Sequence, residues 1–154
     1  MKKRNFLIWP AVALGVGGIS YLLSRKGMEQ TYPLLEKSVL TPPDWLFPIV
    51  WSILYILMGV GFALVLAKQR PGIQDAEPIW ILQLGANFLW SLLFFRWEMY
   101  GTALVCLIAL WLLIVIMIVV FGRTSRLAAW LQVPYLLWVS FAGYLNYVVW
   151  QLNP

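Results

Sequence analysis

The sequence predicts an all-α integral membrane protein, folded as a single bundle of five transmembrane helices. Hydrophobic residues make up 62% of the 154 residues and charged residues only 11%, against about 45–50% and about 25% in soluble domains. A chain of this size has too little interior to hide so much apolar surface from water. The charged residues also fall in short clusters separated by long charge-free stretches. These observations exclude a soluble globular domain.

Five charge-free stretches are each at least 18 residues long, which is enough to cross a hydrocarbon core about 30 Å thick as a helix. Helices are expected because backbone polar groups in lipid must be satisfied within the segment. The apolar run Leu107–Phe121 does not alternate as a barrel strand would. We expect one domain over residues 1–154, with helices at about 5–24, 45–67, 78–95, 99–122 and 127–151.

The first helix follows Lys2, Lys3 and Arg4 and could instead be a cleaved signal peptide. Its apolar run is long for that role, and no small-residue cleavage site leads into Arg25. We therefore expect a retained helix.

The second helix is reached through a long connection, residues 25–44, which contains Pro33, Pro42 and Pro43. A connection of this length in a compact protein favours a lid or a binding loop, although an unstructured loop outside the membrane fits equally well. Pro42 and Pro43 suit the first turn of the helix that follows.

The remaining connections are short, so consecutive helices should be antiparallel neighbours. Five crossings put the termini on opposite sides, and the basic residues divide seven to four between those sides. The larger group is Lys2, Lys3, Arg4, Lys68, Arg70, Arg123 and Arg126, and the smaller is Arg25, Lys26, Lys37 and Arg96. The positive-inside rule then predicts a cell-membrane protein with a cytoplasmic N-terminus, and with the first loop and the C-terminus outside.

Tryptophan is unusually frequent, with ten in the chain. Six lie near predicted helix ends, as in an interfacial aromatic belt: Trp9, Trp45, Trp80, Trp97, Trp130 and Trp150. Trp51, Trp90, Trp111 and Trp138 lie deeper.

The third helix places Gln83, Asn87 and Trp90 on one face. An unpaired buried amide costs on the order of 1–3 kcal/mol, so this face should meet protein or a cavity. Residues of four helices reach a similar depth beneath the long loop: Trp51, Asn87, Trp90, Cys106, Leu110, Trp138, Ala142 and Leu145. We predict an aromatic-lined cavity there, with ordinary helix packing as the alternative.

Several kinds of chemistry are excluded by composition. The chain has no His and a single Cys, Cys106, so we expect no disulfide within the chain, no metal site and no cofactor. The basic residues are scattered over the connections between predicted helices and are not gathered into one patch. We therefore expect no nucleic-acid partner. No phosphate-binding glycine loop is present.

Three motifs resemble the translocator protein family, also called TspO or the peripheral benzodiazepine receptor and, in bacteria, tryptophan-rich sensory proteins. Residues 42–51 (PPDWLFPIVW) with Leu54-Tyr55 and Met58-Gly59 resemble the start of its second helix. Its third helix is matched by Gln83-Leu84, Asn87, Trp90 and Phe94-Phe95. Its fifth is matched by Pro134-Tyr135-Leu136, Trp138, Ala142, Leu145-Asn146, Trp150 and Asn153.

The resemblance implies a five-helix membrane protein, commonly a homodimer, that binds protoporphyrin IX and related tetrapyrroles, sterols, and synthetic benzodiazepine-type or isoquinoline carboxamide ligands. It implies light-dependent oxidative breakdown of porphyrin involving Trp51 and Trp138. The pocket carried over is Tyr32, Pro42, Phe47, Trp51, Asn87, Trp90, Trp138, Ala142 and Leu145. Cys106 and Leu110 join it only through the depth argument. Gln151 replaces the basic residue of the family's sterol pattern.

Small residues suit contacts between membrane helices, so Gly59, Gly61 and Gly15–Gly18 are candidates for a dimer face. For function, the first hypothesis is a membrane receptor for tetrapyrroles with oxidative turnover. The alternatives are a transporter of porphyrins or other small hydrophobic molecules, and a structural subunit. Proton-coupled transport usually leaves an acidic residue or His at mid-membrane, and the predicted helices contain neither.

Overall fold

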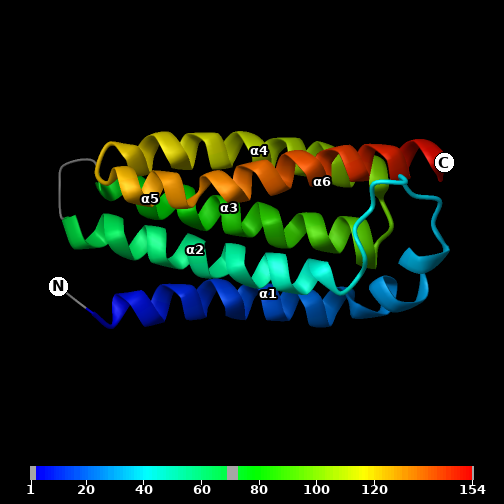
Figure 1. Cartoon of the computed structure of the whole chain (residues 1–154), viewed down its shortest axis with the longest axis horizontal. Helices are drawn as coiled ribbons and strands as arrows, with labels where there is room; N and C mark the ends of the chain where they lie inside the picture. Colours follow the sequence, from blue (N-terminus) through cyan, green and yellow to red (C-terminus); the bar gives the residue numbers. More distant parts are fainter. Residues whose placement is uncertain (1–2, 69–72, 154) are drawn as a thin grey trace.

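The computed structural model describes residues 3–68 and 73–153, and all regular secondary structure in these residues is helical (Figure 1). Lys2 and Arg70, which contributed to the count of basic residues, lie outside the described residues. The α-helices are α1 (Asn5–Gln30), α2 (Leu46–Lys68), α3 (Ala76–Ser91), α4 (Tyr100–Gly122), α5 (Arg126–Leu131) and α6 (Val133–Leu152). Short helical turns are η1 (Tyr32–Leu34), η2 (Ile73–Asp75) and the π-helix η3 (Leu92–Arg96).

Helices lie at each of the first four predicted positions. Four helical segments of the described chain are long and apolar enough to span a membrane: Asn5–Leu34, Leu46–Lys68, Ile73–Arg96 and Tyr100–Gly122. The first helix is longer than predicted, because its polar end from Arg25 to Gln30 continues the helix. Residues 25–30 of the predicted first loop therefore belong to the helix.

The predicted fifth helix, residues 127–151, is two helices. Ser125 caps α5 by accepting a hydrogen bond from the backbone N–H of Ala128. The chain then breaks at Gln132, and Pro134 stands in the first turn of α6, where its missing N–H costs no helical hydrogen bond. α6 is not among the four apolar segments because polar residues such as Asn146 and Gln151 interrupt it.

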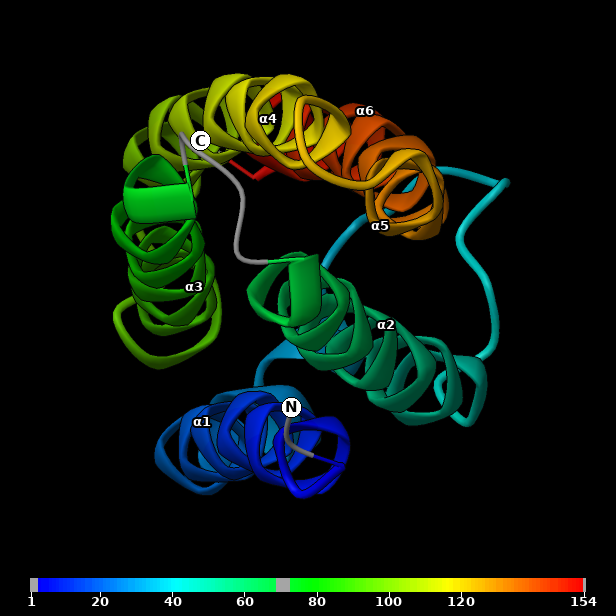
Figure 2. The ribbon, with the colours of Figure 1, turned by 90° about the vertical axis from the view of Figure 1, so that its left-hand side faces the viewer.

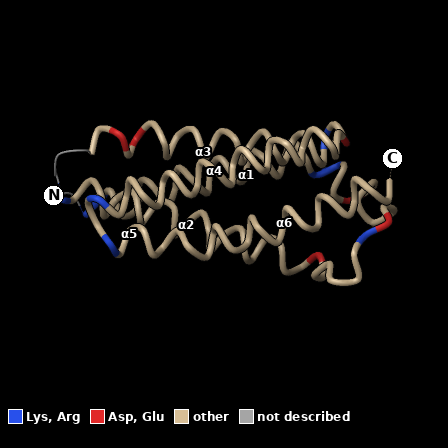
Figure 3. The backbone as a smooth tube through the Cα atoms, turned by 90° about the horizontal axis from the view of Figure 1, so that it is seen from above, with Lys and Arg blue, Asp and Glu red and all other residues tan. Residues whose placement is uncertain are grey.

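The helices run side by side along the long axis of the molecule, with α1 beginning at one end and α6 finishing at the other (Figure 1). Seen end-on, α3, α4 and α6 follow an arc, with α2 at its open side and α1 beyond α2 (Figure 2). Charged residues are confined to the two ends of the bundle (Figure 3). An uncharged middle between charged ends is the pattern expected of helices that cross a bilayer, and the chain is an all-α, multi-pass membrane protein.

Aromatic rings fill the interior of the bundle at the end near the N-terminus. Phe62 and Trp80 stack with their centroids 4.9 Å apart, and Trp9 meets both rings edge-on. Trp80 is 1% exposed and donates its indole N–H to the Met58 carbonyl oxygen. The interpretation of Trp80 as part of an interfacial belt is therefore wrong.

Two glycines that are candidates for a dimer face pack instead against other helices of the same chain. A Cβ at Gly59 would meet the backbone of Trp9 and Pro10, and one at Gly61 would meet the Gln132 side chain. Both therefore permit close approach of α2 to neighbouring helices of the same chain.

Candidate ligand-binding cavity

A cavity of about 680 Å³ lies in the half of the bundle that carries the long loop. Residues of α1, η1, α2, α3, η3 and α6 line it. Its charged lining residues, Glu29 and Asp44, are both acidic and exposed, so the cavity reaches the loop end of the bundle and is open to solvent there. Eight predicted site residues line it together: Tyr32, Phe47, Trp51, Asn87, Trp90, Trp138, Ala142 and Leu145.

Aromatic rings form the walls. The rings of Trp51 and Trp90 are 6.2 Å apart at an angle of 32°. On another wall Trp138 meets Phe47 edge-on at 5.8 Å, and Tyr32 meets Phe95 at 5.5 Å. Helical spacing explains much of this arrangement, because Trp138, Ala142 and Leu145 follow one face of α6.

A chain of neutral hydrogen bonds forms the floor. The Tyr55 hydroxyl donates to Asn87 Oδ1 at 3.0 Å, and Asn87 Nδ2 donates to the Tyr135 hydroxyl at 2.8 Å. Tyr135 in turn donates to Gln83 Oε1 at 2.7 Å. The expectation that Gln83 and Asn87 face protein or a cavity is confirmed, since they are 0% and 2% exposed.

A second polar contact fixes the wall beside the floor. The Trp90 indole N–H donates to Asn146 Oδ1 at 3.0 Å, and Asn146 Nδ2 donates to the Tyr100 carbonyl oxygen at 2.9 Å. Asn146 thereby ties α3 to α6 and α4. Because the only N–H of the Trp90 side chain is used in this bond, Trp90 presents its aromatic ring, and no hydrogen-bond donor, to the cavity.

Three predicted site residues lie elsewhere. Cys106 is half-buried, and its thiol donates to the Ala86 carbonyl oxygen. Leu110 is 0% exposed, in the core. Both are on α4, which contributes no described residue to the cavity. Equal depth was the wrong criterion for this helix, because a residue at that depth must also face the cavity. α4 lies between α3 and α6, on the side of the bundle away from α1 (Figure 2). Pro42 is half-buried in the loop outside the lining, whereas Asp44 and Phe47 line the cavity.

The sequence reasoning missed the wall made by α1. Leu14, Gly17, Gly18 and Tyr21 line the cavity. A Cβ at Gly17 would collide with the Tyr55 ring, so glycine is required where α1 passes that ring. The glycines of α1 could have indicated this wall from the sequence, where they are interpreted as candidates for a dimer face.

The loop is fastened across the end of α6. The Glu36 backbone N–H donates to Asn153 Oδ1 at 3.2 Å, and Asn153 Nδ2 returns a bond to the Glu36 carbonyl oxygen at 2.9 Å. The hydroxyls of Ser38 and Tyr144 are 2.9 Å apart. The Lys37 ammonium donates to the Tyr32 carbonyl oxygen and lies 4.5 Å from the centre of the Tyr32 ring.

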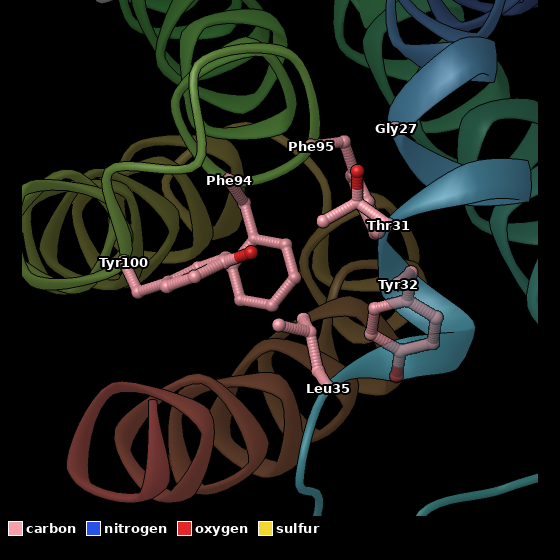
Figure 4. Close-up of a pocket in the computed structure, with 7 residues that line it drawn as sticks. All are labelled: Gly27, Thr31, Tyr32, Leu35, Phe94, Phe95 and Tyr100. Carbon is pink, nitrogen blue, oxygen red and sulfur yellow. The ribbon is translucent and has the colours of Figure 1, made fainter. Parts of the chain in front are cut away.

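A narrow crevice next to the cavity shows how the loop is seated. Leu35 of the loop points toward Phe94, whose ring is 4.9 Å from the Tyr100 ring, and the Tyr32 ring lies beside them, 6.1 Å from the Phe94 ring (Figure 4). The crevice has no room for a water molecule, so it serves as packing. Within the described residues, no three His, Cys, Asp or Glu side chains are placed to hold a metal ion.

Known proteins resemble this chain over most of its length. The TspO/MBR family model matches residues 7–151. The tryptophan-rich protein TspO of Chlorobaculum tepidum is 40% identical over 145 residues, covering 93% of this chain and 92% of the relative. Protein CrtK of Rhodobacter capsulatus is 38% identical, covering 80% and 78% respectively. The human translocator protein is 34% identical over 153 residues, covering 97% and 88%. The match along nearly the whole sequence shows that the chain belongs to the TspO/MBR family.

Proposed function

We propose that the protein is a membrane receptor that binds protoporphyrin IX or a related tetrapyrrole in this cavity. Synthetic benzodiazepine-receptor ligands, including isoquinoline carboxamides, occupy the same space. The observation that carries the proposal is the cavity itself, with about 680 Å³ between aromatic walls. Ligand pockets of about 300–1,000 Å³ suit molecules of this size, and flat π-systems stack against indole and phenyl rings.

The receptor also promotes light-dependent oxidation of the bound porphyrin, with Trp51 and Trp138 as the reactive side chains. They stand on α2 and α6, on different walls of the cavity. An excited porphyrin takes one electron from an indole and passes it to dioxygen, which becomes superoxide. The indole radical cation then regains an electron from the porphyrin, and the porphyrin radical cation combines with the superoxide. The net change is the addition of one dioxygen to the macrocycle, and the tryptophan is restored. The pigment carries the photochemistry, and the protein supplies confinement and the electron donor.

The floor of the cavity favours a receptor over a transporter. Tyr55 and Asn87 end the cavity, and beneath them Met58, Phe62 and Trp80 are at most 1% exposed. A ligand moving further through the bundle would have to displace this packed layer. Transport remains the alternative, and uptake of porphyrin into vesicles containing the protein is the measurement that would establish it.

The partners and the orientation follow from the sequence predictions. We propose a homodimer in the cell membrane, with a cytoplasmic N-terminus and with the long loop and C-terminus outside. The cavity mouth then faces the exterior, where the loop covers it.

Spectral titration of the purified protein with protoporphyrin tests the binding site. Ala142→Trp places a large ring in the cavity and should abolish the shift of the porphyrin absorbance band. Leu137→Trp is the matched control, because Leu137 lies on the same helix but is 65% exposed on its outer side. Wild-type affinity in Ala142→Trp would place the ligand outside this cavity, and absence of binding to the unmodified protein would reject the function.

A further inference from the structure

We propose that Gln83, which does not line the cavity, determines which hydrogen-bonding atoms the cavity presents to its ligand. Gln83 is a positioning residue that acts through Tyr135 and Asn87. This inference rests on the proposed function of the cavity and adds to it the residue that fixes which polar atoms a ligand carbonyl can meet there.

The orientation of the Gln83 amide is dictated by its surroundings. Its nitrogen, Nε2, lies 2.9 Å from the Trp80 carbonyl oxygen and 3.7 Å from the Met58 sulfur. Both atoms are acceptors without a hydrogen to give. Reversing the amide would bring two oxygens together inside a fully buried site, so Oε1 must face Tyr135.

The orientation of the Gln83 amide fixes the orientation of each following group in the series of hydrogen bonds. A hydroxyl has a single hydrogen, and Tyr135 gives its hydrogen to Gln83 Oε1. The Tyr135 oxygen therefore accepts from Asn87, which fixes Nδ2 on that side. Asn87 Oδ1 then faces Tyr55 and accepts the Tyr55 hydroxyl hydrogen. Each bond depends on the one before it, beginning at Gln83.

The chain ends at the cavity surface, where Tyr55 and Asn87 are lining residues while Gln83 and Tyr135 are not. Because Tyr55 has given away its only hydrogen, its oxygen can act toward a ligand only as an acceptor. Asn87 Nδ2 carries two hydrogens and uses one on Tyr135, which leaves one N–H as a donor. A ligand carbonyl satisfies this donor, whereas an isosteric methylene group leaves it buried and unpaired.

The test replaces Gln83 with methionine, which has a similar volume but no strong acceptor. Tyr135 loses its acceptor and turns its hydroxyl toward Asn87, whose nitrogen and oxygen then exchange places. We expect an isoquinoline carboxamide to bind about tenfold more weakly, the scale of one buried hydrogen bond. The matched amine, with a methylene group in place of the carbonyl, should keep its affinity within about twofold because it does not use that bond.

Two further variants separate positioning from packing. Gln132→Met changes a second fully buried glutamine, which bonds to the Leu57 carbonyl oxygen away from the cavity, and should leave the preference for the carbonyl ligand intact. Tyr135→Phe removes the middle link and adds no atoms. It should abolish the same preference, and Gln83→Met should then have no further effect on it.

The outcomes distinguish the two proposals. An unchanged carbonyl preference in Gln83→Met and Tyr135→Phe would overturn the role of Gln83. So would equal weakening of both ligands, or additive losses in the double variant, since these indicate a packing effect. Failure of both ligands to bind the wild-type protein would instead reject the proposed function. Should Gln83→Met not fold, Tyr135→Phe alone decides between these outcomes.

Discussion

At the scale of single residues, the tryptophans of the cavity divide by what their indole groups do. Trp90 is tied to Asn146 by its N–H and is only 8% exposed. Trp51 and Trp138 are half-buried and face the cavity. All three rings line the cavity, and the proposed electron donors are Trp51 and Trp138 because more of each indole is open to a bound pigment than in Trp90.

We predict that Trp51→Phe and Trp138→Phe keep the fold and much of the porphyrin affinity, because phenylalanine preserves an aromatic surface. Phenylalanine is a poorer electron donor than tryptophan, so light-driven loss of bound protoporphyrin should slow toward the rate without protein. Absorbance under constant illumination measures this loss.

Trp111→Phe is the matched control for both variants. Trp111 lies on α4 outside the cavity, with its N–H donated to Ser140, and its replacement should leave bleaching unchanged. If both cavity variants lost bound protoporphyrin at the wild-type rate under illumination, Trp51 and Trp138 would contribute only to binding the porphyrin.

At the scale of elements, the loop between α1 and α2 is held by the last residues of the chain. Asn153 makes two hydrogen bonds to the backbone of Glu36 and a third to the Val149 carbonyl oxygen of its own helix. The loop contributes Tyr32, Pro33 and Asp44 to the cavity lining. The position of the loop over the cavity is therefore linked to the end of α6.

We predict that Asn153→Ala releases bound ligand faster, by about fivefold or more, since the substitution removes two hydrogen bonds to the loop, each worth about 0.5–1.5 kcal/mol. Stopped-flow recovery of tryptophan fluorescence after mixing with a competing ligand measures the release rate. The control is Gln151→Ala, an exposed position in the last turn of the same helix. Identical release from both variants would mean that the loop does not gate the cavity.

At the scale of the whole molecule, the charged ends and uncharged middle determine how the bundle sits in a bilayer (Figure 3). The orientation depends on the balance of basic residues between the two ends. In the described part of the chain, Lys3, Arg4, Lys68, Arg123 and Arg126 belong to one end, and Arg25, Lys26, Lys37 and Arg96 to the other. The excess of basic residues at the N-terminal end therefore comes largely from Lys2 and Arg70, which lie outside the described residues.

We predict that a cysteine at Val39, which is 98% exposed in the loop, reacts with a membrane-impermeant thiol reagent added to intact cells. Both variants would carry Cys106→Ala to remove the native thiol. Leu127→Cys, 58% exposed at the opposite end of the bundle, should react only after lysis. The reverse pattern of labelling would invert the assigned orientation.

The fold class, the first four helix positions, and the faces of α2, α3 and α6 that carry Trp51, Asn87 and Trp138 could be predicted from the sequence. These follow from composition and from spacing along a single helix, both of which are local. Three features could be known only from the folded chain: α4, with Cys106 and Leu110, does not line the cavity, α1 lines it through Gly17, and Asn153 holds the loop. Such features depend on the order of helices around the bundle and the rotation of each about its axis. Contacts between residues far apart in the chain set that order and rotation, and periodicity within one helix carries no information about them.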